Sequence, residues 1–197
     1  MEKKYSTQVL PLKADITDEK QVEHMINTII STFGKIDVLV NNAGIAIDKE
    51  FDERTIEDFK KTLDTNLIAP FIVSRCVGKE MLKRKYGKII NISSTNGINS
   101  FFPTSIDYDA SKAGLINLTH NLALQYAPYI NVNCVAPGWV NTDMNKDLPP
   151  DLIEEERNKI YKKRFAEPEE IAKIVYFLAS DNASFINDEV IKIDGGY

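Results

Sequence analysis

The sequence predicts an α/β fold of the doubly wound type, in which a parallel sheet carries helices on both faces. Two observations predict it: short apolar runs alternate with longer amphipathic stretches, and no internal repeat or low-complexity linker interrupts the alternation. Sheets of this type bind their ligands beyond the carboxyl ends of the strands. We therefore expect the chemistry in the loops that follow the predicted strands.

The elements of the first half follow from periodicity and from residues that end helices. In chain order they are a strand at 8–14, a helix at 18–33, a buried strand at 36–40, a long helical region at 55–85 and a strand at 88–92. Apolar residues recur every three or four positions from Val22 to Phe33, which is typical of an amphipathic helix that Gly34 then ends. Pro70 is expected to kink or divide the long region, because proline has no main-chain N–H to donate.

The second half continues the alternation. In chain order it predicts a helix at 105–126, a strand at 130–136, a charged helix at 150–163, a helix at 168–179 and a last strand at 190–193. Leu115, Leu118 and Leu122 form the apolar stripe of the first of these helices. Pro168 is favourable in the first turn of the last helix.

Composition narrows the class of protein. The 197 residues are enough for one domain, 1–197, and a net charge of −5 argues against general affinity for nucleic acid. The apolar runs are too short to cross a membrane, and the first residues are not of signal-peptide type. Cys76 and Cys134 match no metal spacing, so we expect buried thiols in a reducing, cytoplasmic setting. With His24 and His120 as the only histidines, we expect neither a metal site nor a Ser-His-Asp site.

Three motifs follow predicted strands. Residues 41–44 (NNAG) are small and polar, which permits close approach of another group, although a simple turn is the alternative. Ser94 follows the strand at 88–92, where a hydroxyl can donate to a carbonyl oxygen that gains negative charge, or can cap a turn. Residues 137–143 (PGWVNTD) predict a rigid turn that leads into a lid, residues 141–165.

A tyrosine and a lysine share one face of the helix at 105–126. Tyr108 and Lys112 are four residues apart, so the ammonium is expected to favour the phenolate and to lower the pKa of Tyr108 from about 10. Tyr108 would then serve as an acid and base near neutral pH. An ordinary surface pair is the alternative, and the spacing alone favours it.

Together these residues resemble the short-chain dehydrogenase/reductase family. The motifs in family order are NNAG at 41–44, Asn66, Ser94, YxxxK at 108–112, PG at 137–138 and DGG at 194–196. The resemblance covers nearly the whole chain and implies a Rossmann-like sheet. It is strongest to the 3-oxoacyl-acyl-carrier-protein reductases, through VAPGWVNTDM and EEIAKIVYFLASDNASFI. Residues 127–130 lack the basic residue with which those enzymes dock the carrier protein, while residues 83–85 keep a basic patch.

The resemblance also implies the site. Tyr108 would move the proton at the substrate oxygen, Lys112 would lower its pKa and bind the nicotinamide ribose, and Ser94 would polarise the carbonyl. Asn66 would hold a water that links Lys112 to solvent. The cofactor is NAD(P)H, with NAD and NADP both open, and its implied contacts are Asp15, Ile16, Asn42, Ala43, Gly44, Tyr108, Lys112, Pro137, Gly138, Val140 and Thr142.

Substrate and assembly stay open at this point. The resemblance implies a small carbonyl or alcohol substrate, with an acyl-carrier-protein-bound substrate as one option, and a homo-oligomer, either a tetramer or a dimer. A sugar, polyol or other alcohol dehydrogenase, a non-catalytic truncated protein of this family, and a nucleotide-sugar epimerase or dehydratase are alternatives.

The family's N-terminal segment has no counterpart here. The nine glycines form no GxxxGxG cluster, and the match begins before the family's third strand, which implies an N-terminally truncated sheet. A misplaced start, a fragment of a longer chain or a truncated gene product would explain it, and we favour the first two. Two missing strands would leave a gap of roughly 14 Å between 8–14 and 36–40, at about 4.8 Å per strand. If the chain begins at Met1, we expect weak or absent cofactor binding and little activity.

Overall fold

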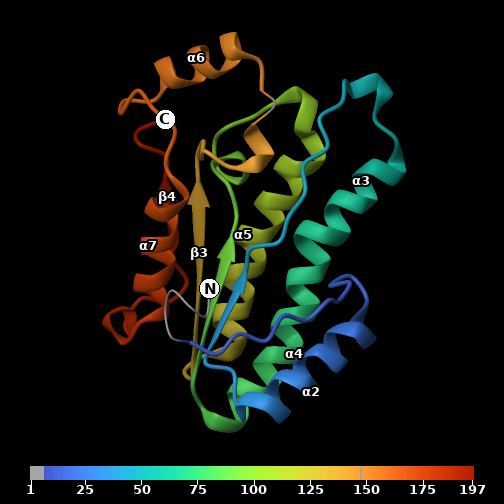
Figure 1. Cartoon of the computed structure of the whole chain (residues 1–197), viewed down its shortest axis with the longest axis vertical. Coiled ribbons are helices and arrows are strands. Elements are labelled where there is room, and N and C mark those ends of the chain that lie inside the picture. The colour runs from blue at the N-terminus through green and yellow to red at the C-terminus, as the bar shows by residue number, and fades with distance from the viewer. Residues whose placement is uncertain (1–6, 147) are drawn as a thin grey trace.

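The computed structural model describes residues 7–146 and 148–197. Four parallel strands form one sheet in the order β1-β2-β3-β4 (Figure 1). They are β1 (Val38–Asn41), β2 (Gly87–Ile92), β3 (Ile130–Pro137) and β4 (Val190–Ile193). The register pairs Ile89 with Val132, and Cys134 with Val190. The predicted parallel α/β sheet is therefore confirmed.

Helices cover both faces of the sheet. They are α2 (Glu19–Phe33), α3 (Ile56–Leu63), α4 (Ala69–Arg84), α5 (Ile106–Tyr126), α6 (Pro150–Lys159) and α7 (Pro168–Ala179). In Figure 1, α7 lies on one side of the strands and α2, α4 and α5 on the other. The helix α6 lies beyond the carboxyl ends of the strands, where the ligand of such a sheet is expected.

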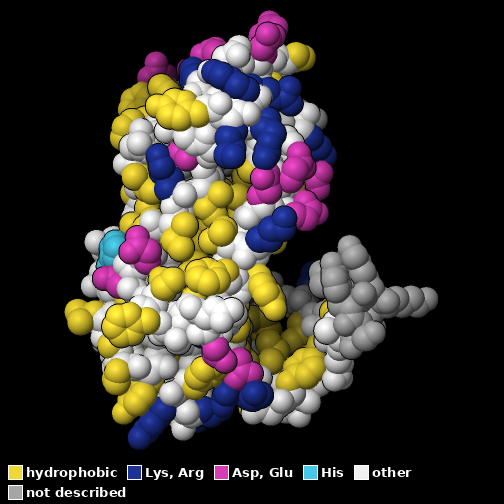
Figure 2. Space-filling view, turned by 90° about the vertical axis from the view of Figure 1, so that its left-hand side faces the viewer, with side chains coloured by type: hydrophobic (Ala, Val, Ile, Leu, Met, Phe, Trp, Pro, Cys, Tyr) yellow, Lys and Arg dark blue, Asp and Glu magenta, His cyan; other side chains and the backbone are white. Residues whose placement is uncertain are grey.

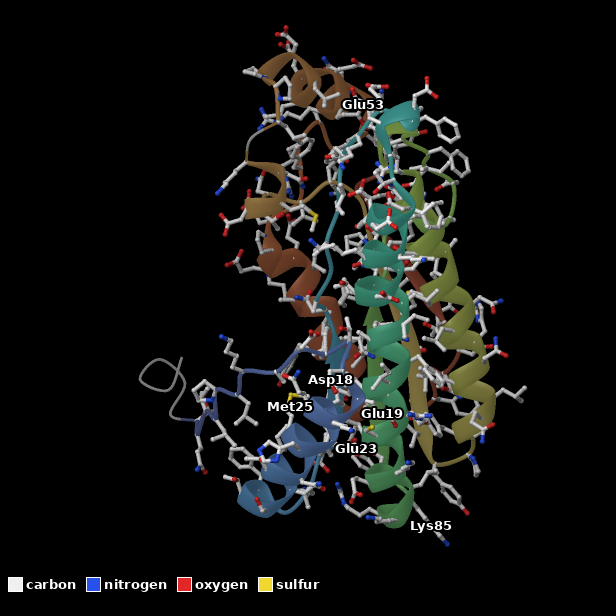
Figure 3. The ribbon with its side chains drawn as sticks, turned by 90° about the vertical axis from the view of Figure 1, so that its right-hand side faces the viewer. Asp18, Glu19, Glu23, Met25, Glu53 and Lys85 are labelled. Carbon is white, nitrogen blue, oxygen red and sulfur yellow. The ribbon has the colours of Figure 1, made fainter. Side chains whose placement is uncertain are left out.

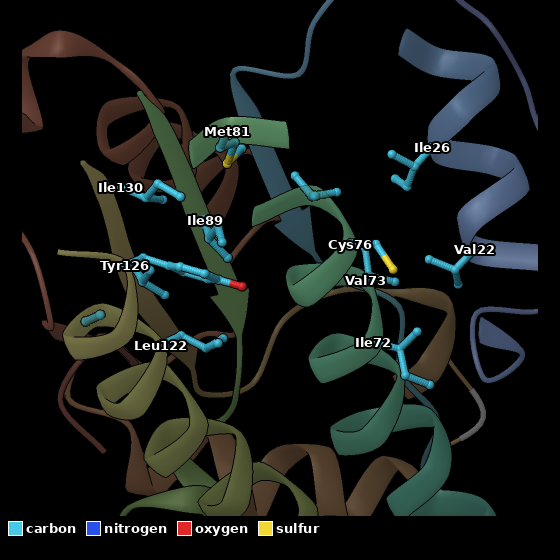
Figure 4. Packing of buried hydrophobic residues seen from close by; sticks show 13 residues of the cluster. Val22, Ile26, Ile72, Val73, Cys76, Met81, Ile89, Leu122, Tyr126 and Ile130 are labelled. Carbon is cyan, nitrogen blue, oxygen red and sulfur yellow. The ribbon is translucent and has the colours of Figure 1, made fainter. Parts of the chain in front are cut away.

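Alternate residues of the strands point into two apolar clusters. Ile89 and Val132 join the cluster under α2, α4 and α5, whose packing Figure 4 shows. Ile90 and Val135 join the cluster under α7. Each fully buried aliphatic side chain contributes about 1.5–3 kcal/mol to folding. The sheet therefore has an apolar core on each face, as expected for a sheet with helices on both faces.

The helix α2 begins and ends where the sequence predicts. The Asp18 carboxylate caps it by accepting from the main-chain N–H groups of Lys20 and Gln21, and Gly34 ends it with a φ of 78°. Figure 3 shows Asp18, Glu19 and Glu23 on α2 where it lies beside α4. Arg75 of α4 forms an ion pair with Glu19 across that contact.

The predicted strand at 8–14 is wrong. These residues form no strand, and Val9 and Leu12 are 39% and 38% exposed. Apolar alternation alone does not make a strand, which requires a neighbouring edge for its ladder. In the part of the chain that the structure describes, β1 pairs with β2 alone. Val38 and Val40 are therefore 36% and 40% exposed, so the strand predicted to be buried is an edge strand.

The long helical region is divided as predicted, but over a wider stretch. The helix α3 ends at Leu63, a π-helical turn spans Asp64–Ile68, and α4 carries Pro70 in its first turn. The turn directs Asn66 into the interior, where it is fully buried. The charged helix at 150–163 is shorter than predicted, because Ile160 is extended and α6 ends at Lys159. Within the described residues, no helix is long and apolar enough to span a membrane.

Candidate active site

A cavity of about 1020 Å³ opens at the carboxyl ends of the strands. Among the residues that line it are most of those that the sequence predicts for the site: Asn42, Ala43, Gly44, Ser94, Tyr108, Lys112, Pro137, Gly138, Val140 and Thr142. They come from four separate loops or helices. The structure thus brings the motifs of residues 41–44, 94, 108–112 and 137–142 to one space.

Lys112 lies one helical turn after Tyr108 on α5, and its ammonium is bonded to the main chain. Its Nζ donates a hydrogen bond of 2.8 Å to the main-chain carbonyl oxygen of Ile92 and lies 5.4 Å from the centre of the Tyr108 ring. Only 4% of Lys112 is exposed. Burial disfavours the charged form and lowers the pKa of Lys112 to about 8.

The predicted lowering of the pKa of Tyr108 is wrong for this structure. Burial raises the pKa of the phenol, while its interaction with the Ser94 hydroxyl opposes that shift. The desolvation of the phenolate prevails because the Lys112 ammonium is directed to the Ile92 carbonyl. Tyr108 is therefore a neutral phenol at neutral pH, which is the form that donates a proton.

Ser94 is held at the start of a short 3-10 turn, Thr95–Gly97. Its Oγ accepts from the main-chain N–H of Asn96 and donates to the Asn96 side-chain oxygen, both at 3.2 Å. Ser94 therefore caps this turn, which is the alternative role expected from the sequence. Close approach of Gly97 to α5 positions this turn, since a Cβ at Gly97 would lie 2.7 Å from the Lys112 carbonyl.

Asn66 lies behind the cavity instead of lining it. Its side chain accepts from the Ile45 N–H at 2.9 Å, donates to the Ile45 carbonyl at 2.8 Å, and donates to the Ser111 hydroxyl at 3.0 Å. The amide thus ties the loop of residues 42–46 to α5. These three hydrogen bonds go to protein groups, and the water that the resemblance implies at Asn66 stays a prediction.

Asp15 and Ile16 are not among the residues that line the cavity. The Asp15 carboxylate accepts from the N–H and the hydroxyl of Thr17, at 2.9 and 2.7 Å. Ile16 packs against the apolar cluster under α2. The contact with the adenine ring that the resemblance implies for them stays a prediction.

A buried ion pair that the sequence did not predict lies beside the cavity. The Arg54 Nη1 donates to Asp107 at 2.5 Å, and the Thr62 hydroxyl donates to the same carboxylate at 2.6 Å. Arg54 also donates to the main-chain carbonyls of Ile47, Lys49 and Thr104. The pair braces the loop after β1 against α5. Its partners are 53 residues apart, so no local pattern indicates it.

Two acidic residues lie near the groups of the site. Asp48 lines the cavity, its pKa is raised by partial burial, and its carboxylate has no hydrogen-bond partner among the described residues. Asp109 follows Tyr108 and accepts from the Asn96 side chain at 2.7 Å and from the Phe102 N–H at 3.1 Å. Residues 7–146 and 148–197 place no group of three His, Cys, Asp or Glu side chains that could hold a metal ion.

Comparison with known proteins identifies the family. A family model described as enoyl-(acyl carrier protein) reductase matches residues 1–197. A 3-oxoacyl-[acyl-carrier-protein] reductase of Thermotoga maritima is 40% identical over 187 residues, which are 94% of this chain and 76% of that relative. The chain belongs to the short-chain dehydrogenase/reductase family.

Other members agree with this assignment. An NAD-dependent glycerol dehydrogenase of Listeria innocua is 35% identical over 193 residues, which are 97% of this chain and 76% of that relative. The solved structure of ElxO with NADP bound has a TM-score of 0.88 at 37% identity, over 94% of this chain and 77% of that chain. The chain is accordingly an NAD(P)-dependent oxidoreductase that acts on CH–OH or carbonyl groups.

The residues present fit the nicotinamide half of a short-chain dehydrogenase cofactor. A Cβ at Gly44 would lie 3.5 Å from Lys112 Nζ and 3.3 Å from the Asn66 side-chain oxygen, so glycine leaves the approach to the ammonium free. Lys112 and Tyr108 supply donors that ribose hydroxyls accept from. The sequence has no GxxxGxG loop to bind the pyrophosphate. The fit therefore concerns the reacting end of the cofactor.

Proposed function

We propose that this protein reduces the ketone of a 3-oxoacyl group carried on acyl carrier protein. The observation that carries the proposal is the convergence of Ser94, Tyr108 and Lys112 on one cavity, with the Tyr108 phenol in its neutral form. A protonated phenol is ready for the reductive direction, because reduction of a ketone consumes one proton. The name of the Thermotoga maritima relative supplies the substrate class.

Each side chain of the site has a distinct task. NAD(P)H, when bound, supplies the hydride to the carbonyl carbon. The Ser94 hydroxyl donates a hydrogen bond to the carbonyl oxygen, and the Tyr108 phenol delivers the proton to that oxygen as negative charge develops. The Lys112 ammonium, which is held at the Ile92 carbonyl, would bind the ribose. Asn66 positions the loop of residues 42–46 through Ile45.

The other predicted cofactor contacts are residues of the same cavity. Asn42, Ala43 and Gly44 would flank the adenosine side of the cofactor, and Pro137, Gly138, Val140 and Thr142 its nicotinamide side. We propose residues 141–165 as the substrate lid of a single catalytic domain, 1–197. Val140 and Ala166 form an isolated β-bridge, which holds the two ends of this segment together.

The experiment measures oxidation of NADPH and of NADH by the purified chain with acetoacetyl-CoA, a 3-oxoacyl thioester. Because the sequence has no GxxxGxG loop to bind the pyrophosphate, we expect slow turnover of the thioester, at high concentration of at least one cofactor. Its kcat/KM should still exceed that for oxidation of glycerol or gluconate. A higher kcat/KM for the polyols would overturn the proposed substrate class. No oxidoreductase activity on any of these substrates, with a folded chain, would favour the non-catalytic alternative.

A second candidate, oxidation of a sugar or polyol, is favoured by Asp48. Its carboxylate faces the cavity without a partner among the described residues, and it would accept hydrogen bonds from substrate hydroxyls. The Listeria innocua glycerol dehydrogenase is a relative of this kind. If the second candidate holds, Asp48→Asn raises the KM for a polyol and leaves the KM for acetoacetyl-CoA unchanged.

We also propose a cytoplasmic homo-oligomer, either a tetramer or a dimer. Figure 2 shows the α7 side of the molecule, where apolar side chains are exposed over the middle of the surface. Tyr176 and Phe185 belong to this region of the chain and are 77% and 103% exposed. Cys76 and Cys134 are both free thiols, as a reducing compartment requires. Sedimentation velocity measures the assembly, and a monomer at micromolar concentration would contradict it.

A further inference from the structure

A fully buried carboxylate lies behind the wall of the cavity. Glu156 is on α6 and is 1% exposed, yet it does not line the cavity. It accepts from the Trp139 indole N–H at 2.9 Å, from the Tyr197 hydroxyl at 2.5 Å and from the Lys159 ammonium at 2.6 Å. A buried carboxylate without such donors is strongly destabilising, so all three donors matter for its placement.

The indole that Glu156 binds is itself part of the cavity wall. Trp139 stacks on Phe165 at 5.3 Å and 13°, and it meets Phe102 edge to face at 5.6 Å and 81°. The two ring contacts set the plane of the indole. The N–H bond to Glu156 fixes the place of its nitrogen. The ring is thus fixed by two aromatic contacts and one charged acceptor.

A chain of contacts connects this wall to the reacting groups. Phe102 donates its N–H to Asp109, and Asp109 accepts from Asn96, which in turn is bonded to Ser94. Asp109 also directly follows Tyr108 in α5. The position of Trp139 relative to the Ser94 and Tyr108 hydroxyls therefore depends on both α6 and the loop before α5.

We propose that Glu156 is a positioning residue, which fixes Trp139 as the wall against which the substrate packs beside its reacting carbon. Met144, Leu148 and Leu152 line the same cavity from the lid, so the wall that Trp139 continues is apolar. It fits an acyl chain or a ring better than a chain of hydroxyl groups. The kinetic part of this inference rests on the proposed function, and the orientation of Trp139 does not.

Trp139 is the only tryptophan of the chain, so tryptophan fluorescence reports on this residue alone. The variants are Glu156→Leu, which removes the acceptor, and Glu156→Gln, which keeps an acceptor oxygen without the charge. Glu155→Gln is the matched control, because Glu155 pairs with the same Lys159 but is 63% exposed and has no recorded contact with Trp139. Acrylamide quenching and time-resolved anisotropy are measured in the folded proteins, with circular dichroism as the check on folding.

We expect Glu156→Leu to increase acrylamide quenching and to add a fast component to the anisotropy decay. Glu156→Gln should lie between Glu156→Leu and the wild type, and Glu155→Gln should match the wild type. If Glu156→Leu fails to fold, Glu156→Gln carries the test against Glu155→Gln. Wild-type quenching and anisotropy in the folded Glu156 variants would overturn the proposal, whatever their thermal stability.

Kinetics with acetoacetyl-CoA supply the second readout. Loss of the fixed aromatic wall should raise the KM by about threefold to tenfold, with a smaller change in kcat. The dissociation constant for NADPH should stay at the wild-type value. A change in kcat alone would refute the role in substrate packing. If the wild type turns over no carbonyl substrate while the fluorescence results hold, the proposed function fails and the placement of Trp139 by Glu156 stands.

Discussion

The ammonium of Lys112 is bonded to the main-chain carbonyl oxygen of Ile92, at 2.8 Å, at the end of the central strand β2. This contact joins the helix that carries Tyr108 to the sheet at the point where the cavity opens. It also holds a cation in the interior, which burial disfavours. The bond therefore accounts for the position of Lys112, and burial lowers its pKa to about 8.

The pKa of Lys112 predicts a pH dependence of stability. Burial lowers it from 10.5 in the unfolded chain to about 8 in the folded one, so between these pH values the unfolded chain binds more protons. The free energy of unfolding therefore gains, from this group, up to about 3 kcal/mol as the pH rises through that range. Urea denaturation of the wild type and of Lys112→Met measures this dependence. The free energy of unfolding of the wild type should rise relative to that of Lys112→Met as the pH rises from about 8 to about 10.5.

The control for this measurement is Lys83→Met, because the Lys83 side chain is 69% exposed. Its difference from the wild type should not change over the same pH range. A constant difference between the wild type and Lys112→Met would contradict the buried ammonium.

Removal of the Tyr108 hydroxyl tests the proton donor. Tyr108→Phe should lower turnover by about 10²–10⁴-fold, which is the range for loss of a general acid. The ring and Lys112 stay, so the dissociation constant for NADPH, measured by fluorescence titration, should rise by no more than about tenfold, the loss of one hydrogen bond. Tyr129→Phe is the control, because Tyr129 is 41% exposed and does not line the cavity. Turnover at the wild-type rate in Tyr108→Phe would exclude the assigned role.

Arg54→Met leaves the Asp107 carboxylate buried without its cation. The Arg54 and Asp107 side chains are 4% and 0% exposed, so the variant should lose about 3–5 kcal/mol of unfolding free energy. Glu80→Gln breaks the exposed pair with Lys83 and should cost less than about 1 kcal/mol. Urea denaturation measures both. Equal losses would show that burial does not distinguish the two pairs.

Gly97→Ala tests the close approach of the Ser94 turn to α5. A Cβ there would lie 2.7 Å from the Lys112 carbonyl, which is rigid main chain, so we expect a loss of about 1–3 kcal/mol and lower turnover. Gly114→Ala is the control, since its Cβ would approach only the flexible end of Leu67, at 2.8 Å. A Gly97→Ala protein with wild-type stability and turnover would contradict this packing.

The parts of the fold that depend on local sequence could be predicted. The limits of α7 and β4 agree with the prediction residue by residue, since a proline at the start of α7 and a short apolar run at β4 mark them. The strand expected at 8–14 could not be judged locally, because a strand exists only with a neighbouring edge. β1 is exposed for the same reason, because within the described residues it pairs with β2 alone.

The candidate site divides in the same way. The motifs at 41–44, 94 and 137–142 could be assembled from the order of strands and helices, because they follow carboxyl ends of parallel strands, while 108–112 lies near the start of α5. The Arg54–Asp107 pair and the bond of Glu156 to Trp139 join residues far apart in the sequence, so neither leaves a local pattern. The pKa of Tyr108 was misjudged because the spacing of a lysine does not show where its ammonium is directed.

The most direct test of the role of Tyr108 compares the wild type with Tyr108→Phe in one assay, the acetoacetyl-CoA-dependent oxidation of NADPH or NADH at high cofactor concentration. We expect measurable turnover by the wild type and a loss of about 10²–10⁴-fold in the variant, with both proteins equally folded. Equal rates in the two proteins, or no carbonyl reduction by a folded wild type that binds the cofactor, would contradict it.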